Sequence, residues 1–232
     1  MNAKTIGIVG CSAEGAALCY RTLCAEAPQR MGPHSHPEIV MHTPSLSLYV
    51  EALEDNDLEK VAELMVTSAE ILAQAGAELL ICPDNTIHQA MDKVRPNSPV
   101  PWLHIAEVLA QFAHGKGFRR VGLTGTRWLV DSEVYPKALA GLGIDFERPS
   151  ESQRQEINRI IMDELVYGQF KPGSIQYFQD VVDHFKAKGC DAVVLGCTEI
   201  PLILGDHNAS LPTLDSTRLL ARAALNYAID GE

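Results

Sequence analysis

One stretch of the sequence occurs twice and decides the fold. Residues 76–86, GAELLICPDNT, are echoed 113 positions later by residues 189–199, GCDAVVLGCTE. Each copy has a glycine, then a short apolar run, then a turn with polar residues. An apolar run of this length, without polar alternation, is typical of a strand buried on both faces of a parallel sheet. The repeated stretch therefore predicts two equivalent strands, each of which ends in a polar turn.

Two further matches extend the repeat in the same order. Residues 6–10 (IGIVG) match residues 121–125 (VGLTG) at an offset of 115, and residues 101–104 (PWLH) match residues 212–215 (PTLD) at an offset of 111. Three ordered matches at nearly constant spacing indicate an internal duplication. We predict two pseudo-symmetric lobes, with residues 1–105 plus 215–232 in the N-terminal lobe and residues 106–214 in the C-terminal lobe.

Apolar strands alternate with helix-like segments along the whole chain. This order predicts the α/β class, with a parallel sheet flanked by helices in each lobe. The predicted strands are residues 5–10, 38–42, 78–82, 100–104, 120–125, 192–196 and 211–215. The predicted helices are residues 13–27, 58–75, 105–114, 150–168, 173–188 and 216–228.

The composition excludes several classes of protein. Apolar residues make up 46% of the chain and charged residues 21%, which is enough apolar material for a core and argues against disorder. No apolar run approaches the roughly 20 residues of a membrane helix, and residues 1–10 resemble a strand rather than a secretory signal. The net charge of −11 without a Lys/Arg cluster argues against nucleic acid as a partner. We expect a cytoplasmic protein that binds neither nucleic acid nor membrane.

The cysteines and histidines do not form a metal site or a disulfide framework. The six cysteines include no Cys-x-x-Cys pair, so reduced thiols are expected. His34 and His36 lack partners at zinc-site intervals. The chain also has no glycine-rich dinucleotide fingerprint. We predict no metal and no cofactor.

The duplication has a chemical consequence, because it aligns Asp84 with Cys197. Both follow a predicted strand, and ligand sites of open α/β sheets lie at the carboxyl ends of strands. If the lobes face each other across a cleft, the two side chains point into it from opposite sides. One group could then remove a proton from one face of a carbon while the other returns a proton to the opposite face, as a racemase requires.

Both residues also have simpler interpretations. Free cysteine is among the most buried residue types, so Cys197 could be a packing residue at the end of a strand. The tripeptide Pro-Asp-Asn is strong turn chemistry, so Asp84 could be only a turn residue. The register of the repeat favours the functional interpretation for both.

Polar neighbours of this pair are candidate ligands for a carboxylate. Asn85 and Thr86 are predicted to cap the next helix, where side chains and free N–H groups also suit an anion. Thr126, in a Gly-Thr-Arg turn, is a weak anion-binding signal, and Ser12 is first a helix cap. The remaining candidates directly follow Cys197 and are Thr198 and Glu199. His88 is expected to have a structural role.

These motifs resemble the aspartate/glutamate racemase family of cofactor-independent amino-acid racemases. The resemblance spans nearly the whole chain and is most specific at residues 196–199 (GCTE). Its other marks are residues 6–10 with Ser12 and Glu14, Asn85-Thr86 with His88, residues 125–127 (GTR), residues 156–158 (EIN), Glu164-Leu165 and residues 168–170 (GQF). It implies two α/β lobes with the site between them, a homodimer, and neither pyridoxal phosphate nor metal.

The resemblance assigns roles to the candidates. Asp84 and Cys197 would be the two acid/base groups. The α-carboxylate of a small amino acid, aspartate- or glutamate-like, would be held by Asn85, Thr86, Thr126 and Thr198, with Ser12 and Glu199 as weaker contacts. Asp84 departs from the family pattern, which usually has cysteine directly before Asn-Thr.

Because of this departure, two other functions stay open at this stage. A single-cysteine relative could protonate an enolate after decarboxylation of a substituted malonate, as the similar arylmalonate decarboxylases do. A non-catalytic relative would bind a small carboxylate without turnover.

Overall fold

The structure is a computed structural model that describes residues 3–231. Contacts divide the chain into two compact units. Residues up to Val108, together with those from Thr217 onward, form unit 1, and Leu109–Ser216 forms unit 2. The lobe boundaries expected from the sequence, at 105/106 and 214/215, stay a prediction.

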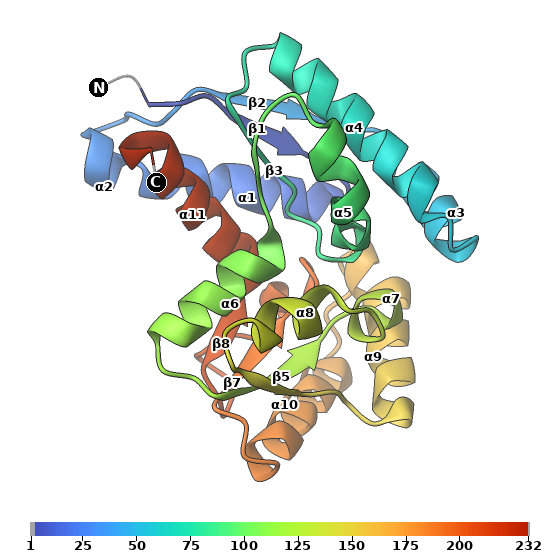
Figure 1. Ribbon diagram of the computed structural model, residues 1–232. Coiled ribbons are helices and arrows are strands. Elements are labelled where there is room, and N and C mark those ends of the chain that lie inside the picture. Colours follow the sequence, from blue (N-terminus) through green and yellow to red (C-terminus); the bar gives the residue numbers. More distant parts are fainter. Residues whose placement is uncertain (1–2, 232) are drawn as a thin grey trace. The chain divides into compact units, whose positions relative to one another are not determined.

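Unit 1 is built on a parallel sheet with the strand order β2-β1-β3-β4. Its strands are β1 (Ile6–Val9), β2 (Ile39–His42), β3 (Leu79–Ile81) and β4 (Trp102–Leu103). Helix α4 packs on β1 and β2, while α1 lies on the opposite face of the sheet (Figure 1). The sheet is thus covered on both faces, as its uninterrupted apolar strands predict.

The long helices of unit 1 follow the predicted ranges closely, whereas its short ones were not predicted. The long ones are α1 (Ala13–Glu26), α4 (Leu58–Gln74), α6 (Ile105–Gly115), which continues into unit 2, and α11 (Ser216–Asp230), whose first residue belongs to unit 2. Shorter segments are α2 (Pro28–Met31), α3 (Leu46–Glu54), η1 (Thr86–Ala90), α5 (Met91–Val94) and η2 (Arg95–Asn97). Among the described residues of both units, no helix has the length and hydropathy needed to span a membrane.

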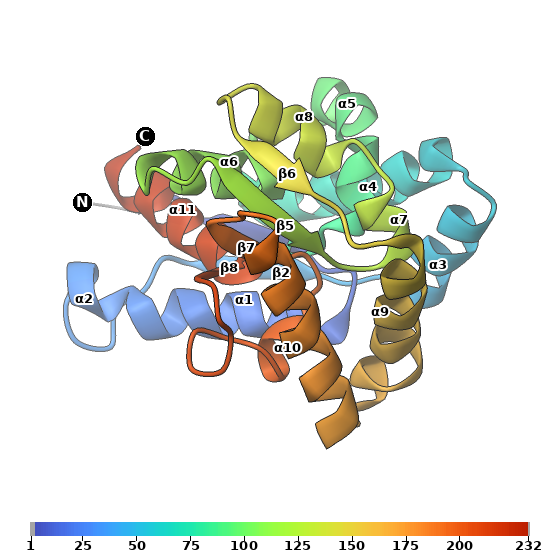
Figure 2. The same ribbon diagram turned by 90° about the horizontal axis from the view of Figure 1, so that it is seen from below.

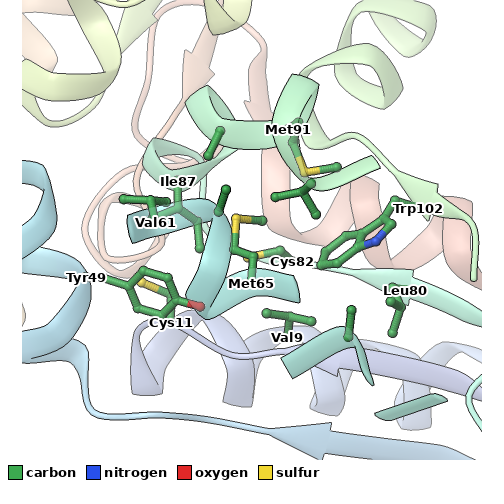
Figure 3. Packing of buried hydrophobic residues seen from close by; sticks show 14 of the residues in the cluster. Val9, Cys11, Tyr49, Val61, Met65, Leu80, Cys82, Ile87, Met91 and Trp102 are labelled. Atoms are coloured by element: carbon green, nitrogen blue, oxygen red, sulfur yellow. The ribbon is translucent and has the colours of Figure 1, made fainter. Parts of the chain in front are cut away.

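Alternate residues of the strands feed two separate cores in unit 1. On one face, Val9, Leu80 and Cys82 join side chains of α3, α4 and α5, among them Tyr49 and Met65 (Figure 3). On the other face, the strand residues Ile6, Ile8, Leu79 and Ile81 pack with apolar residues of α1 and α11. Because successive side chains of a strand point to opposite faces, a run such as residues 79–82 can supply both cores.

Unit 2 repeats the architecture with the strand order β6-β5-β7-β8, again parallel. Its strands are β5 (Arg120–Thr124), β6 (Asp145–Glu147), β7 (Ala192–Leu195) and β8 (Thr213–Asp215). Its helices are α7 (Arg127–Val130), α8 (Val134–Ala140), α9 (Glu151–Asp163), η3 (Leu165–Tyr167), α10 (Pro172–Ala187) and η4 (Ile200–Leu202). Strands β5 and β6 lie side by side, and α10 packs on β5 and β7 (Figure 2).

The strand register confirms the duplication residue by residue. In unit 1, Gly7 pairs with Leu80, and in unit 2 Gly122 pairs with Val193. These are the partners that the offsets of 115 and 113 relate. The outer pairs agree as well, because Leu80 pairs with Trp102 where Val193 pairs with Thr213. The predicted α/β class with two similar parallel sheets is therefore correct.

Several elements differ from the prediction, which contained none of the helices α2, α3, α5, α7 and α8. The helix expected over 150–168 ends at Asp163, and a short 3-10 turn follows up to Gly168, whose left-handed backbone (φ 68°) stops it. Strand β6, residues 145–147, was not predicted. Its sequence is DFE, and it lies at an edge of the sheet, where burial does not impose an apolar run.

Glu164 is the buried carboxylate that ends α9 and ties it to the start of α10. Its Oε2 accepts a 2.5 Å hydrogen bond from Ser174 Oγ, and its Oε1 accepts a 2.8 Å bond from Arg159. Lys171 Nζ lies 3.3 Å from the same Oε1. These donors, Ser174 first and then Arg159, lower the pKa of Glu164 to about 2.

We expect E164Q to be less stable than the parent protein at pH 7. The pKa of Glu164 is depressed in the folded state, so the stability it contributes is complete above the unfolded-state value of about 4.3. It is lost as the pH falls toward 2. Urea unfolding at pH 7, 4 and 3 should show a gap between parent and variant that narrows with acidification.

E156Q serves as the matched control. Glu156 also pairs with Arg159, at 2.6 Å, but on the exposed surface. Exposed pairs contribute about 0–1 kcal/mol, so this variant should lose little stability. An equal effect of both substitutions, or a gap independent of pH, would contradict the assignment of Glu164.

Candidate active site

The turn after β3 presents Asp84 at the carboxyl end of the strand. Asp84 Oδ1 accepts hydrogen bonds from the backbone N–H groups of Thr86 (3.0 Å) and Ile87 (3.3 Å). Asp84 is half-buried, whereas Asn85 and Thr86 are buried. The carboxylate therefore closes the turn by these two bonds, and the residue stays partly accessible to solvent at the end of the strand.

The capping role expected of Asn85 is wrong, because Asp84 has it. The segment that follows is the 3-10 helix η1, and the Asn85 side chain makes no capping hydrogen bond. Asn85 already has a helical backbone (φ −73°, ψ −38°), whereas an N-cap residue needs an extended one for its side chain to reach the amides ahead. The carboxylate one residue earlier reaches them.

Cys82 belongs to the core and does not replace the missing family cysteine. Its side chain is fully buried beside Met65 and Leu80 (Figure 3). Burial raises the pKa of the Cys82 thiol well above its ordinary value, and the nearby Asp84 carboxylate raises it further. A thiol in this state is a poor base.

The equivalent turn of unit 2 follows β7 and carries Cys197. The Cys197 thiol donates to Glu199 Oε2 at 2.9 Å, and Thr198 Oγ1 donates to the same oxygen at 2.8 Å. Cys197 is half-buried, while Thr198 and Glu199 are each 4% exposed. A carboxylate that accepts a hydrogen bond from the S–H group favours the thiol over the thiolate, because a thiolate beside it would be repelled.

Gly196 is required directly before Cys197 because β5 approaches closely. A Cβ atom at this position would lie 2.4 Å from the carbonyl oxygen of Thr124 and 2.7 Å from Leu129 Cδ2. The Gly196 N–H donates to that same carbonyl at 3.0 Å. The backbone directly before Cys197 is thus held against the neighbouring strand β5.

Thr126 and Ser12 lie at helix starts that follow the strands next to these turns. Thr126 caps α7 by accepting a bond from the N–H of Leu129 at 3.4 Å, and Ser12 caps α1 by accepting one from Gly15 at 3.2 Å. The cap expected at Ser12 is present, and Thr126 is a cap that was not predicted from the sequence. Because β1 neighbours β3 and β5 neighbours β7, each helix start lies beside a polar turn at the same sheet edge.

Asn158 supports this edge through a hydrogen bond between residues that lie far apart in the sequence. Its Oδ1 accepts a 3.0 Å bond from the N–H of Arg127, which follows Thr126. Asn158 belongs to α9 and lies 31 residues away, so no local pattern could indicate the contact. Its place in the EIN motif of the family resemblance was the only signal.

The structure gathers the candidate residues into two groups, one in each unit. Ser12, Asp84, Asn85 and Thr86 lie at the carboxyl edge of the β1–β3 pair. Thr126, Cys197, Thr198 and Glu199 lie at the carboxyl edge of the β5–β7 pair. Within residues 3–231, no group of three or more His, Cys, Asp or Glu side chains is arranged to hold a metal ion.

The two groups offer different chemistry at positions that the register makes equivalent. Ile81 corresponds to Val194 at the offset of 113, so Asp84 and Cys197 both lie three residues beyond equivalent strand positions. One carries a carboxylate that binds two backbone amides, and the other carries a thiol bonded to a carboxylate.

The chain thus has two parallel sheets of the same strand order, and an ionisable side chain follows the third strand of each, Asp84 after β3 and Cys197 after β7. The family model described as Asp/Glu/Hydantoin racemase matches residues 6–224. The chain belongs to this family.

Relatives and solved structures agree with this membership. The broad specificity amino-acid racemase RacX of Bacillus subtilis is 22% identical over 200 residues, which are 82% of each chain. A Yersinia pestis crystal structure, provisionally described as an Asp/Glu racemase, superposes with a TM-score of 0.90 at 29% identity and covers 97% of this chain and 99% of its own. The aspartate racemase homologue PH1733 of Pyrococcus horikoshii gives a TM-score of 0.84 at 27% identity, with 97% and 99% covered.

We expect D84A to destabilise the turn and D84N to preserve it. Loss of an N-cap side chain costs about 0.5–2 kcal/mol, and the amide oxygen of asparagine can still accept the two bonds. Hydrogen exchange of the Thr86 and Ile87 amides should accelerate in D84A and stay close to the parent in D84N. Unchanged protection in D84A would show that the carboxylate does not cap η1.

Proposed function

We propose that this protein is a racemase-type isomerase, independent of pyridoxal phosphate, that moves a proton at the α-carbon of a small amino acid. Asp84 and Cys197 are the two acid/base groups. The observation that carries the proposal is their equivalence in register at the carboxyl ends of β3 and β7. The proposal includes a site in a cleft between the lobes, a homodimer and a cytoplasmic location.

The unequal partners of the two groups define the resting enzyme. Hydrogen bonds from two backbone amides favour the charged form of Asp84, so it begins as the base. Cys197 begins as the acid, because its S–H donates to Glu199. Asp84 accepts the Cα proton, the bonding electrons pass into the substrate carboxylate system, and Cys197 protonates the opposite face. The enzyme is left as a carboxylic acid and a thiolate, and the reverse reaction begins from that form.

The remaining candidates bind the substrate. Asn85, Thr86, Thr126 and Thr198 supply hydrogen-bond donors for the α-carboxylate, with Ser12 as a weaker contact. Glu199 is suited to the α-amino group, because a carboxylate attracts an ammonium ion.

The side chain of the substrate is open to test. An aspartate- or glutamate-like substrate agrees with the family name, but Asp84 is a carboxylate where the family usually has a thiol, and it repels a second carboxylate nearby. A screen of both enantiomers of the common amino acids, followed by chiral chromatography and deuterium uptake at Cα, tests the proposal directly.

A single-cysteine decarboxylase is the second candidate. The observation that favours it is that Cys197 is the one thiol at the two equivalent positions, since Cys82 lies in the core. Release of carbon dioxide from a substituted malonate, without racemisation of any amino acid, would favour this function. Binding of a carboxylate without either reaction would indicate a non-catalytic relative.

We expect D84N and C197S to abolish racemisation in different ways. D84N keeps the turn but cannot transfer the proton, so exchange through the Cys197 face survives for one enantiomer. C197S removes the thiol, and a serine alkoxide is far less accessible near pH 7, so exchange survives only through the Asp84 face. Deuterium incorporation from each pure enantiomer measures both effects. Undiminished racemisation by D84N would leave Asp84 as a turn residue and require another base.

We expect turnover to be unchanged after dialysis against a chelator and after treatment with hydroxylamine, which removes pyridoxal phosphate. Proton transfer by two side chains needs neither group. Initial rates before and after treatment test this. Activity that returns only when zinc or pyridoxal phosphate is added would contradict the proposed chemistry.

A further inference from the structure

His88, in η1, is buried against the turn that carries Asp84. His88 is 2% exposed, and its Nε2 lies 3.0 Å from the carbonyl oxygen of Cys82. A carbonyl oxygen only accepts hydrogen bonds, so Nε2 must carry the proton and donate it. Buried carbonyl groups need such a donor, and Cys82 is the last residue before Pro83 and Asp84.

The second ring nitrogen keeps His88 in one state. Nδ1 is buried and has no hydrogen-bond partner among the residues the structure describes. Protonation would place an N–H there without an acceptor, and the His104 ring lies edge-on, with its centroid 4.5 Å from that of His88. Burial lowers the pKa of His88 well below its ordinary value and His104 lowers it further, while the bond to the Cys82 carbonyl opposes this shift; Arg95 lowers the pKa and Glu107 raises it to smaller extents. His88 is therefore a neutral ring with its proton on Nε2.

Two sets of side-chain bonds close the same short turn. Asp84 Oδ1 holds the amides at its far end, and His88 Nε2 holds the carbonyl at its near end. Asp84 lies between the two anchors, two residues after Cys82 and four before His88. Without the His88 bond, the Cys82 carbonyl loses this donor, and the backbone that leads to Asp84 loses an attachment.

We propose that His88 is a positioning residue for Asp84. By its bond to the Cys82 carbonyl, His88 holds the backbone that places the Asp84 carboxylate for proton transfer. This inference rests on the proposed function. His88 does not contact the substrate. Displacement of a reacting group by about 1 Å can cost about 100-fold in rate, so an anchor of this kind acts on the chemistry at one face of the substrate.

The pair H88Q and H88N tests the inference. Both introduce an amide of the same polarity, but only the longer glutamine side chain extends an N–H to the place of Nε2. The probe is the amino acid that exchanges its Cα proton fastest in the enantiomer screen. The face whose exchange is lost in D84N defines the Asp84 face, and the face whose exchange is lost in C197S defines the Cys197 face.

We expect H88N to slow exchange through the Asp84 face by about 10- to 100-fold, with little effect at the Cys197 face and little change in KM. H88Q should restore most of the loss. W102F is the matched control, because Trp102 is buried in the same core as Cys82, and the substitution removes buried volume and a 2.7 Å bond to Ser98 Oγ without touching the His88–Cys82 bond. It should leave both exchange rates near those of the parent.

Equal losses at both faces, no loss in H88N, or no recovery in H88Q would overturn the inference. If D84N itself leaves exchange at both faces intact, the proposed function fails instead, so the two failures are distinguishable. Should H88N not fold, nitrogen-15 NMR of the parent protein decides the matter. The His88 ring should be neutral with the proton on Nε2 at pH 7, and a proton on Nδ1 would overturn the inference.

Discussion

The structure depends on the parallel pairing of β1 with β3 and of β5 with β7. Strands β1, β3 and β7 are fully buried and contain no polar side chain, so the polar residues of the turns after β3 and β7 lie beyond the strands. In both units the first accessible position is the third residue after equivalent strand residues, where Asp84 and Cys197 lie. The register of the sheets therefore determines where acid/base chemistry is possible.

The two strand ends have the same backbone plan but opposite electrostatics. At Asp84 the partners are backbone N–H groups, which stabilise negative charge. At Cys197 the partner is the carboxylate of Glu199, which disfavours a negative charge on the sulfur. The duplication thus preserved position, while substitution at single residues made the halves chemically different. A symmetric pair of thiols would need a different environment to acquire one base and one acid.

Much of the fold was predictable because the signals were local and repeated. The apolar runs at residues 79–81 and 192–195 predicted two strands. Gly76 and Gly189, both with a positive φ, lie directly after the C-cap residues of α4 and α10. The edge strand β6 was not predictable, since a partly exposed edge tolerates the sequence DFE. The same distinction holds for the site. Position and register of Asp84 and Cys197 follow from the repeat, but Asn158 and the His88–Cys82 bond depend on contacts that no spacing rule indicates. The error at Asn85 arose because its own backbone is already helical, a property that its residue type does not determine.

The path of the chain has a consequence for the order in which the protein can be assembled during synthesis. Unit 2 is one continuous segment, whereas unit 1 is completed only by residues from Thr217 onward. Five side chains of α11, Leu220, Ala221, Ala224, Leu225 and Ala228, belong to the core on one face of its sheet. Domains that emerge from the ribosome generally fold as units, but here the N-terminal sheet leaves first and lacks part of its cover until the whole of unit 2 has been made. Unit 2 can therefore be the first to reach its final packing. The apolar sheet face formed by Ile6, Ile8, Leu79 and Ile81 stays accessible to chaperones or to other chains until α11, translated more than a hundred residues later, packs on it.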